Sequence, residues 1–344
     1  MSVTISHIAK EAGVSQTTVS RVLNNSESVK EETREKVLKV IKELNYTPSA
    51  IARSLSTSKT NTIGVVVPDI NNPFFGEVIK GISEEADKHD LNIILCDTND
   101  SLNKELKALK LLKEQRIQGV IITPNSVEDE FNGEYLKILE NLGIPVILLE
   151  GEVKYSNFSG VFIDNIKGGY QGTEALIKAG HKKIAIITGR IKTLSAKNRL
   201  VGYKKALAMN NIDIDEKYIF YGDYRRETGY SIAKQIMNME DRPTAIFVSS
   251  NLMTFGAIKA IYEENYKIPE DIAIMGFDNI DVLDIIGMNI SYVNGPSMEI
   301  GKRSLRMLME GLDKSKHKEM EKVTLMPQLI LKGSEKYIPE TQET

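Results

Sequence analysis

Apolar residues recur at helical spacing in three short segments near the N-terminus. In the first segment, ISHIAKEA, they fall at intervals of three and four residues. Two further segments, QTTVSRVLN and VKEETREKVLKVIKELNY, place their apolar residues on one face and their polar residues on the other. Three such faces are enough to share a small core. The pattern therefore predicts helices at residues 5–12, 16–24 and 29–46.

A tight turn joins the first two predicted helices. Gly13 supplies the turn, and Thr4 and Ser15 stand directly before the two helices. A hydroxyl at such a position accepts a hydrogen bond from the free N–H groups of the first helical turn. Two short helices joined in this way form a helix-turn-helix, whose second helix protrudes from the domain.

The outer face of the second predicted helix carries Gln16, Thr17, Ser20 and Arg21. Glutamine and arginine have the donor geometry to read adenine and guanine edges in the major groove, and Thr17 can contact a thymine methyl group or a phosphate. The face therefore favours binding to double-stranded DNA. A three-helix docking module with a polar face is the alternative.

From residue 62 onward, runs of β-branched residues alternate with amphipathic helical patterns. This alternation is typical of parallel sheets with helices on both faces. Eight strands are too many for one small sheet, and the segment KYSNFSG, residues 154–160, divides them into two similar halves. We therefore predict an α/β core of two doubly wound subdomains that binds a ligand between them at the carboxyl ends of the strands. The eight predicted strands are residues 62–69, 92–98, 119–124, 145–151, 183–190, 218–223, 245–250 and 272–278.

Charge divides the chain at about the same place as the pattern does. The whole chain carries −3, yet residues 1–60 hold nine basic and six acidic residues, and the remainder holds 35 and 41. A basic head on an acidic body fits a nucleic-acid-binding domain joined to a larger protein core. The length of 344 residues also favours more than one domain.

Other functional classes find little support in the sequence. Cys96 is the single cysteine, the four histidines lie far apart, and Cys96 is expected in a buried strand. We therefore expect no metal and no cofactor. The sequence contains no P-loop, no G-x-G-x-x-G after the first strand and no Ser-His-Asp constellation, so we expect no enzyme. No apolar run approaches the roughly 18 residues of a membrane span and no signal peptide is visible, so we expect a cytoplasmic protein without membrane contact.

The stretch VTISHIAKEAGVSQTTVSRVLNNSESVKEETREKVLKVIKELNYTPSAIARSL closely resembles the DNA-binding headpiece of the lactose/galactose repressor family. The resemblance continues along nearly the whole chain. It implies a headpiece at residues 1–47 and a hinge helix and linker at residues 48–60. It further implies DNA contacts from Thr4, Ser15, Gln16, Thr17, Ser20, Arg21 and Asn24.

The hinge implied by this resemblance is NYTPSAIARSLSTSKTNT. In the family, two hinge helices pair in the minor groove, and a leucine from each enters the central base step. The matching leucine here is Leu55, with Ala52 and Arg53 lining the groove. An apolar wedge costs a few kcal/mol of base stacking and gains a closer fit to the bent duplex.

The core, residues 61–344, resembles the periplasmic sugar-binding proteins whose fold the repressor family shares. The chain of such a core crosses three times between its subdomains. We place the N-subdomain at about 61–160 and 291–320, and the C-subdomain at about 161–290 and 321–335. On this interpretation YVNGPSMEIGKRSLRMLMEG returns to the first half and VTLMPQLILKG to the second.

The same resemblance implies which residues line the effector cleft. An aromatic ring suits the C–H face of a sugar, and amides, carboxylates and arginine suit its hydroxyls. Phe75 as a core residue, and Arg199 and Asp278 as an interdomain salt bridge, are alternatives. The implied effector-binding residues are Asn72, Phe74, Phe75, Glu150, Arg199, Tyr224, Ser250, Asn251 and Asp278.

Three positions depart from the family pattern. Glu150-Gly151 stands where Asp-Arg is frequent, Ser250-Asn251 where Asn-Asp is frequent, and Gly295 where a glutamine is frequent. These changes remove polar groups from the cleft, so the effector is expected to be larger, modified or differently charged than a plain hexose. Arg190 and Lys197 are candidates for compensating an anionic ligand.

The sequence thus predicts a homodimeric transcriptional repressor that binds a pseudo-palindromic operator and responds to a small, sugar-like effector. Two headpieces are expected because one offers few base contacts, and two read a two-fold site. The tail after Leu331 lacks the leucine heptads that would favour a tetramer. A regulator of the same architecture controlled by a phosphorylated partner protein is one alternative, and a solute-binding protein for a transporter is another.

Overall fold

The computed structural model describes residues 3–23, 28–46, 60–155, 157–313 and 320–337. The chain divides into two compact units, Met1–Thr60 and Asn61–Thr344. Within the described ranges, no helix combines the length and the apolar composition that a membrane crossing requires.

The first unit contains the three predicted helices. They are α1 (Ile5–Ala12), α2 (Gln16–Leu23) and α3 (Glu31–Glu43). The Thr4 hydroxyl accepts from the backbone N–H of His7 at 3.4 Å, and the Ser15 hydroxyl accepts from that of Thr18 at 3.1 Å. Gly13 ends α1 in the left-handed conformation, φ 64°, which glycine adopts without strain. The apolar faces of the three helices form one small core.

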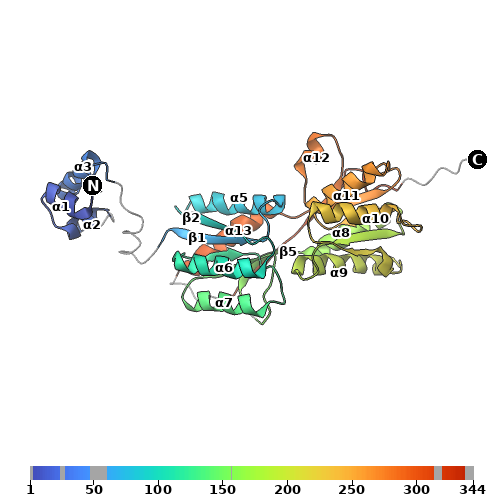
Figure 1. Cartoon of the computed structure of the whole chain (residues 1–344), viewed down its shortest axis with the longest axis horizontal. Helices are drawn as coiled ribbons and strands as arrows, with labels where there is room; N and C mark the ends of the chain where they lie inside the picture. The colour runs from blue at the N-terminus through green and yellow to red at the C-terminus, as the bar shows by residue number, and fades with distance from the viewer. Residues whose placement is uncertain (1–2, 24–27, 47–59, 156, 314–319, 338–344) are drawn as a thin grey trace, which may run out of the picture. The chain divides into compact units, whose positions relative to one another are not determined.

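The second unit begins with a six-stranded parallel sheet in the order β11-β5-β4-β3-β1-β2. Helices α5 and α13 cover one face of this sheet, and α6 and α7 cover the other (Figure 1). The strands are β1 (Thr62–Val67), β2 (Asn92–Asp97), β3 (Val120–Ile122), β4 (Val146–Leu149), β5 (Ser159–Ile163) and β11 (Lys322–Leu325). The helices are α5 (Pro73–Asp87), α6 (Leu102–Glu114), α7 (Glu130–Asn141) and α13 (Ser297–Leu312).

A second six-stranded sheet has the order β12-β10-β9-β8-β6-β7 and is parallel except for β12. Helices α8 and α9 cover one face, and α10 and α11 cover the other (Figure 1). The strands are β6 (Ile184–Thr188), β7 (Ile219–Tyr221), β8 (Ala245–Val248), β9 (Ala273–Phe277), β10 (Ser291–Asn294) and β12 (Gln328–Ile330). The helices are α8 (Asn165–Lys178), α9 (Leu194–Met209), α10 (Arg226–Met237), α11 (Asn251–Glu263), the short α12 (Asp281–Ile285) and a 3-10 turn at Glu216–Tyr218.

All eight predicted strands are present, but the chain crosses between the sheets at other positions than we expected. Strand β5 pairs with β4 in the first sheet, so the first crossing follows residue 163 rather than residue 160. Strand β10 belongs to the second sheet, and only α13 of that segment returns to the first. Strand β11 pairs with β5 in the first sheet, so only β12 of the final segment joins the second. Periodicity identifies a strand but not its partner, and strand pairing decides these boundaries.

Three pairs of helices approach each other through glycine. In the α8–α9 pair, a Cβ on Gly169 would lie 2.2 Å from the carbonyl oxygen of Arg199, and one on Gly202 would lie 2.2 Å from that of Ile166. Corresponding pairs are Gly229 with Gly256 between α10 and α11, and Gly81 with Gly301 between α5 and α13. The α8–α9 contact matters most for the site, because it fixes the helix that carries Arg199.

We predict that Gly202→Ala lowers the free energy of unfolding by about 1–3 kcal/mol, because the added methyl group must displace backbone rather than a side chain. The measurement is the urea midpoint followed by far-UV circular dichroism. Gly76→Ala in α5 is the matched control, because nothing lies within 4 Å of its Cβ position. This control should raise stability by about 0.4–1 kcal/mol. Equal midpoints for the two variants would show that the α8–α9 approach is not tight.

Candidate functional site

The polar face of α2 lies opposite the headpiece core. Val19 and Val22 are buried in that core, whereas Gln16, Thr17 and Arg21 are exposed and Ser20 is half-buried. The exposed hydroxyl of Ser15 caps α2. Thr4 is likewise exposed and caps α1. The helix therefore presents the predicted polar row to solvent, with a positive charge in its last turn.

Four residues predicted to contact DNA cannot be placed. Asn24 and the hinge residues Ala52, Arg53 and Leu55 lie outside the residues that the structure describes. Their roles stay predictions from the sequence.

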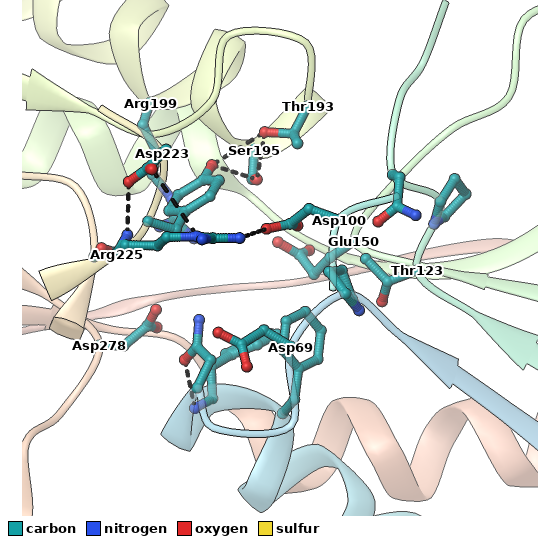
Figure 2. A pocket seen from close by; sticks show the side chains of 18 residues that line it. Asp69, Asp100, Thr123, Glu150, Thr193, Ser195, Arg199, Asp223, Arg225 and Asp278 are labelled. Atoms are coloured by element: carbon teal, nitrogen blue, oxygen red, sulfur yellow. Dashed lines mark hydrogen bonds and ion pairs between the residues drawn. The ribbon is translucent and has the colours of Figure 1, made fainter. Parts of the chain in front are cut away.

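A pocket lies in the second unit at the carboxyl ends of both sheets. The space between its lining side chains measures about 760 Å³, counted with the part that is open to solvent. The residues that line it come after strands β1 to β4 of the first sheet and after strands β6 to β9 of the second (Figure 2). In each sheet the strand order reverses beside the first strand, β1 or β6, and such switch points are where doubly wound folds bind ligands.

The loop after β1 places the predicted asparagine and aromatic residues on the first wall. Asn72 caps α5, because its Oδ1 accepts from the backbone N–H of Phe74 at 3.0 Å. Phe74 and Phe75 pack edge to face with ring centroids 5.1 Å apart. Phe75 is 8% exposed and belongs to the core of the first subdomain, so it is both a core residue and a lining residue.

A buried hydrogen-bonded chain, Glu150–Asn165–Arg199, joins the two walls. The Glu150 carboxylate follows β4 and accepts from the backbone N–H of Ile163 and from Asn165 Nδ2, the latter at 2.9 Å. Asn165 begins α8, and its Oδ1 accepts from Arg199 Nε at 2.8 Å. Burial raises the pKa of Glu150 to about 7, against the opposing effects of Asn165 and Arg199. The chain is therefore a direct polar link between the subdomains.

Arg199 has two further contacts within the second subdomain. Its Nη1 donates to the carbonyl oxygen of Ser249 at 2.6 Å, and its guanidinium lies 3.5 Å from the ring centroid of Phe277. The side chain is thus fixed by a strand end and an aromatic face. These contacts differ from the interdomain salt bridge that the sequence allowed as an alternative role for Arg199.

Two polar atoms of the pocket are buried without a hydrogen-bond partner. They are Thr123 Oγ1 on the first wall and Asp278 Oδ1 on the second. The Asp278 carboxylate points into the cavity in Figure 2, and its backbone has a φ of 64°. Burial raises the pKa of Asp278, with Arg199 opposing the shift. Buried polar atoms are normally satisfied, so these two atoms are available to hydrogen-bond with a group that enters the cavity.

The remaining predicted residues divide between the pocket and its support. Tyr224 lines the cavity, and its hydroxyl lies 3.1 Å from Thr193 Oγ1 and 3.0 Å from Ser195 Oγ. Ser250 lines the cavity and caps α11. Asn251, which we expected in the pocket, is not among its lining residues. It is buried in the first turn of α11, where its Oδ1 accepts from the backbone N–H of Leu252 at 2.7 Å.

Sequence reasoning missed eight polar lining residues. All of them lie in the loops and first helical turns after the strands. Their position directly after a predicted strand is therefore the signal that could have identified them as lining residues. The first subdomain contributes Asp69, Asp100, Thr123 and Asn125. The second contributes Thr193, Ser195, Asp223 and Arg225.

Packing accounts for the two glycines that depart from the family pattern. A Cβ on Gly151 would lie 2.8 Å from Pro124 Cδ. A Cβ on Gly295 would lie 2.5 Å from Ile163 Cδ1 and 3.2 Å from Asp278 Oδ1. Neighbouring side chains therefore occupy the space that larger residues would need.

Ion pairs connect the two subdomains beside the pocket. The Asp100 carboxylate pairs with Arg190 and lies 3.7 Å from Arg225 Nη2. Lys197 Nζ pairs with Glu128 at 3.1 Å. The sequence offered Arg190 and Lys197 as compensation for an anionic ligand; in the structure each is paired with a carboxylate of the opposite subdomain, and neither is among the lining residues.

Comparison with known proteins matches both units of the chain. Residues 4–49 match the model of bacterial regulatory proteins of the lacI family, and residues 60–335 match the model of periplasmic binding proteins and the sugar-binding domain of that family. The HTH-type transcriptional repressor PurR of Mannheimia succiniciproducens is 33% identical over 97% of this chain and 99% of its own length.

Solved structures with the same fold include the lac repressor dimer bound to operator and the anti-inducer ONPF. It has a TM-score of 0.86 and 26% identity, and the match covers 98% of this chain and 100% of that one. The complex of the transcriptional regulator CelR with cellobiose has a TM-score of 0.73 and 28% identity, covering 96% of this chain and 99% of that one.

These matches confirm the resemblance and the predicted fold class, a helix-turn-helix headpiece followed by a two-subdomain α/β core. The family models cover the headpiece and the core separately, and the relatives match along nearly their whole length. The chain therefore belongs to the lacI family of bacterial regulatory proteins and is a DNA-binding transcriptional repressor with an effector-binding core.

Proposed function

We propose that the protein is a homodimeric repressor whose affinity for a pseudo-palindromic operator falls when a sugar-like effector binds in the pocket of the core. The observation that carries this proposal is the pocket itself, whose walls come from both subdomains and meet through Glu150, Asn165 and Arg199. A repressor of bacterial genes acts on cytoplasmic DNA, so the proposal places the protein in the cytoplasm.

Coupling requires only that the effector prefer one arrangement of the subdomains. A ligand that contacts both walls stabilises the arrangement in which those walls are the right distance apart. In the proposed dimer, this arrangement sets the positions of the two hinge segments and hence of the two headpieces. Binding at one site then changes affinity at the other by a coupling free energy, without any contact between them.

The effector class follows from the chemistry of the lining. Phe74, Phe75 and Tyr224 offer apolar faces, and Asp278 and Thr123 offer polar atoms that lack partners. A molecule with several hydroxyl groups and an apolar ring face satisfies both requirements. The CelR neighbour was solved with cellobiose, which supports the same class. The alternative of a phosphorylated protein partner gains no support from these contacts.

Exposed apolar side chains support the proposed dimer. Helix α12 and the residue after it expose Val282, Ile285 and Ile286, and Ile285 is 82% exposed. Strand β2 is the edge of the first sheet and exposes Leu95. Neighbouring apolar side chains on a surface mark an interaction site, and we propose a second copy of the chain as the partner. The lac repressor neighbour is itself a dimer on its operator.

The first test is a thermal-shift screen of the full chain against pentoses, hexoses and disaccharides. A ligand at about 100 times its dissociation constant should add about 2.7 kcal/mol of stability. An operator selected from random palindromic DNA then reports whether a hit lowers DNA affinity. A hit that stabilises the protein but leaves operator affinity unchanged would contradict the proposed coupling.

We predict that Arg21→Ala weakens operator binding by about 1–3 kcal/mol per half-site, because a base-reading arginine loses bidentate hydrogen bonds. Binding to non-operator DNA should change much less. Fluorescence anisotropy with both DNAs at one salt concentration measures the two losses. Equal losses would indicate a phosphate contact instead of base recognition.

For the pocket, we predict that Asp278→Ala lowers effector affinity by about ten- to a hundredfold, because a hydrogen bond to a charged group contributes about 1.5–3 kcal/mol. Calorimetric titration with the screened effector measures the change. Operator binding should persist, because Asp278 lies in the core and not in the headpiece. The urea midpoint of the variant is measured as well, because alanine loses the interactions of the carboxylate with the Gly295 backbone and Arg199 and is strained at the φ of 64° found there. Glu216→Ala removes a carboxylate paired with Lys204 outside the pocket and serves as the control. Unchanged affinity in the Asp278 variant would place the effector elsewhere.

For the dimer, we predict that Ile285→Glu produces monomers in sedimentation equilibrium, because a buried charge without a partner disfavours association. Operator affinity should fall with it, since two linked headpieces bind far more tightly than one. Phe131→Glu is the matched control, because Phe131 of α7 is also a highly exposed apolar residue, at 67%. If Ile285→Glu remains dimeric, α12 does not lie in the interface.

A further inference from the structure

We propose that the effector is an uncharged, hydroxyl-rich molecule, and that the pocket rejects the phosphorylated and carboxylated derivatives of the same sugar. The inference rests on the proposed function, because it takes the pocket between the two sheets as the effector site. It goes further by assigning the charge class of the ligand.

Carboxylates outnumber cations along the pocket wall. The acidic lining residues are Asp69, Asp100, Glu150, Asp223 and Asp278, and the arginines of the lining are Arg199 and Arg225. Burial raises the pKa of Glu150 and Asp278, so the negative charge comes mainly from the half-buried carboxylates Asp69, Asp100 and Asp223. These come from both subdomains, so an anion entering the cavity would meet negative charge on both walls. Like charges brought together in a site of low solvent access cost several kcal/mol.

Arg225 is already engaged by acidic neighbours. Its Nη2 lies 3.7 Å from Asp100 Oδ2 and donates to Asn99 Oδ1 at 3.3 Å, and its Nε lies 4.0 Å from Asp223 Oδ2. Arg190, just outside the lining, pairs with the same Asp100 carboxylate. To bind a phosphate group, these arginines would have to give up their contacts with Asp100, which join the two subdomains.

Arg199 is also engaged by groups of the protein. It donates to Asn165 Oδ1 at 2.8 Å and to the Ser249 carbonyl oxygen at 2.6 Å, and it stacks on Phe277. It also lies close enough to Glu150 and Asp278 to influence both carboxylates. Its charge therefore offsets buried negative charge of the protein rather than that of a ligand.

The polar atoms that remain unsatisfied suit hydroxyl groups. In its ionised form Asp278 Oδ1 is an acceptor, so the group that it binds must then be a hydrogen-bond donor. A sugar hydroxyl donates, whereas a phosphate or carboxylate group near neutral pH presents acceptors. Thr123 Oγ1 on the opposite wall can donate or accept a hydrogen bond, so it suits a hydroxyl group on the other side of the ligand.

Matched sets of ligands test the inference on the full chain. Each set contains a neutral sugar and its charged derivatives: glucose with glucose 6-phosphate and glucuronate, ribose with ribose 5-phosphate, and cellobiose with cellobionate. Calorimetric titration at low ionic strength keeps electrostatic discrimination visible. We expect a neutral member to bind and its charged counterparts to bind at least about a hundredfold more weakly.

Two results would overturn the inference. One is a charged member that binds as tightly as its neutral parent, and the other is a panel in which no neutral member binds. Operator binding measured on the same samples separates this failure from failure of the repressor function, because DNA affinity does not depend on which sugar class is right.

The Asp100→Asn variant tests the cause of the discrimination. It removes the carboxylate that engages Arg190 and Arg225, and asparagine tolerates the φ of 60° found there. The affinity ratio of the phosphorylated to the neutral sugar should rise about tenfold or more. Glu216→Gln, which removes an equal charge outside the pocket, should leave the ratio as in the wild type. An unchanged ratio in Asp100→Asn would contradict the proposed role of the acidic wall.

Discussion

The Glu150–Asn165–Arg199 chain is the interaction on which the rest of the core depends. It crosses from the end of β4 in the first sheet to helices α8 and α9 of the second. Burying a carboxylate costs free energy unless the carboxylate is paired and hydrogen-bonded. A change in the arrangement of the two subdomains would therefore either expose Glu150 to solvent or remove its hydrogen-bond partners. The same chain lies against the pocket, so ligand contacts and subdomain arrangement share the same residues.

Helix packing makes this chain possible. Gly169 and Gly202 let α8 and α9 approach closely, and this approach places Arg199 within reach of Asn165. Ion pairs from Asp100 and Glu128 also join the subdomains. The arginines of the pocket lining are therefore already engaged by groups of the protein, which leaves little positive charge for a ligand.

Local patterns were sufficient to predict the headpiece. Thr4, Gly13 and Ser15 mark helix ends through backbone chemistry that does not depend on distant residues, and the structure has the helices where those residues predict them. The eight core strands were visible for the same reason. The sheet to which β10 and β11 belong could not be predicted, because their partners β9 and β5 are distant in sequence.

The pocket was predicted only in part, again for a physical reason. The family resemblance identified Glu150, Ser250 and Asp278, and these residues line the pocket because they directly follow strands whose ends meet at one edge of a sheet. Asn251 follows a strand as well, but the first turn of α11 directs its side chain to backbone instead. Arg190 and Lys197 looked available for a ligand because their partners, Asp100 and Glu128, belong to the other subdomain. An ion pair across a cleft leaves no pattern in the sequence around either of its residues.

In the proposed repressor, effector binding and operator binding are coupled through a mutual free energy. The effector dissociation constant of the full chain, determined once without DNA and once with saturating operator, measures this coupling. Linkage requires that operator weaken effector binding by the same factor by which effector weakens operator binding. We predict equal factors greater than one. Identical effector affinities with and without operator would contradict this coupling.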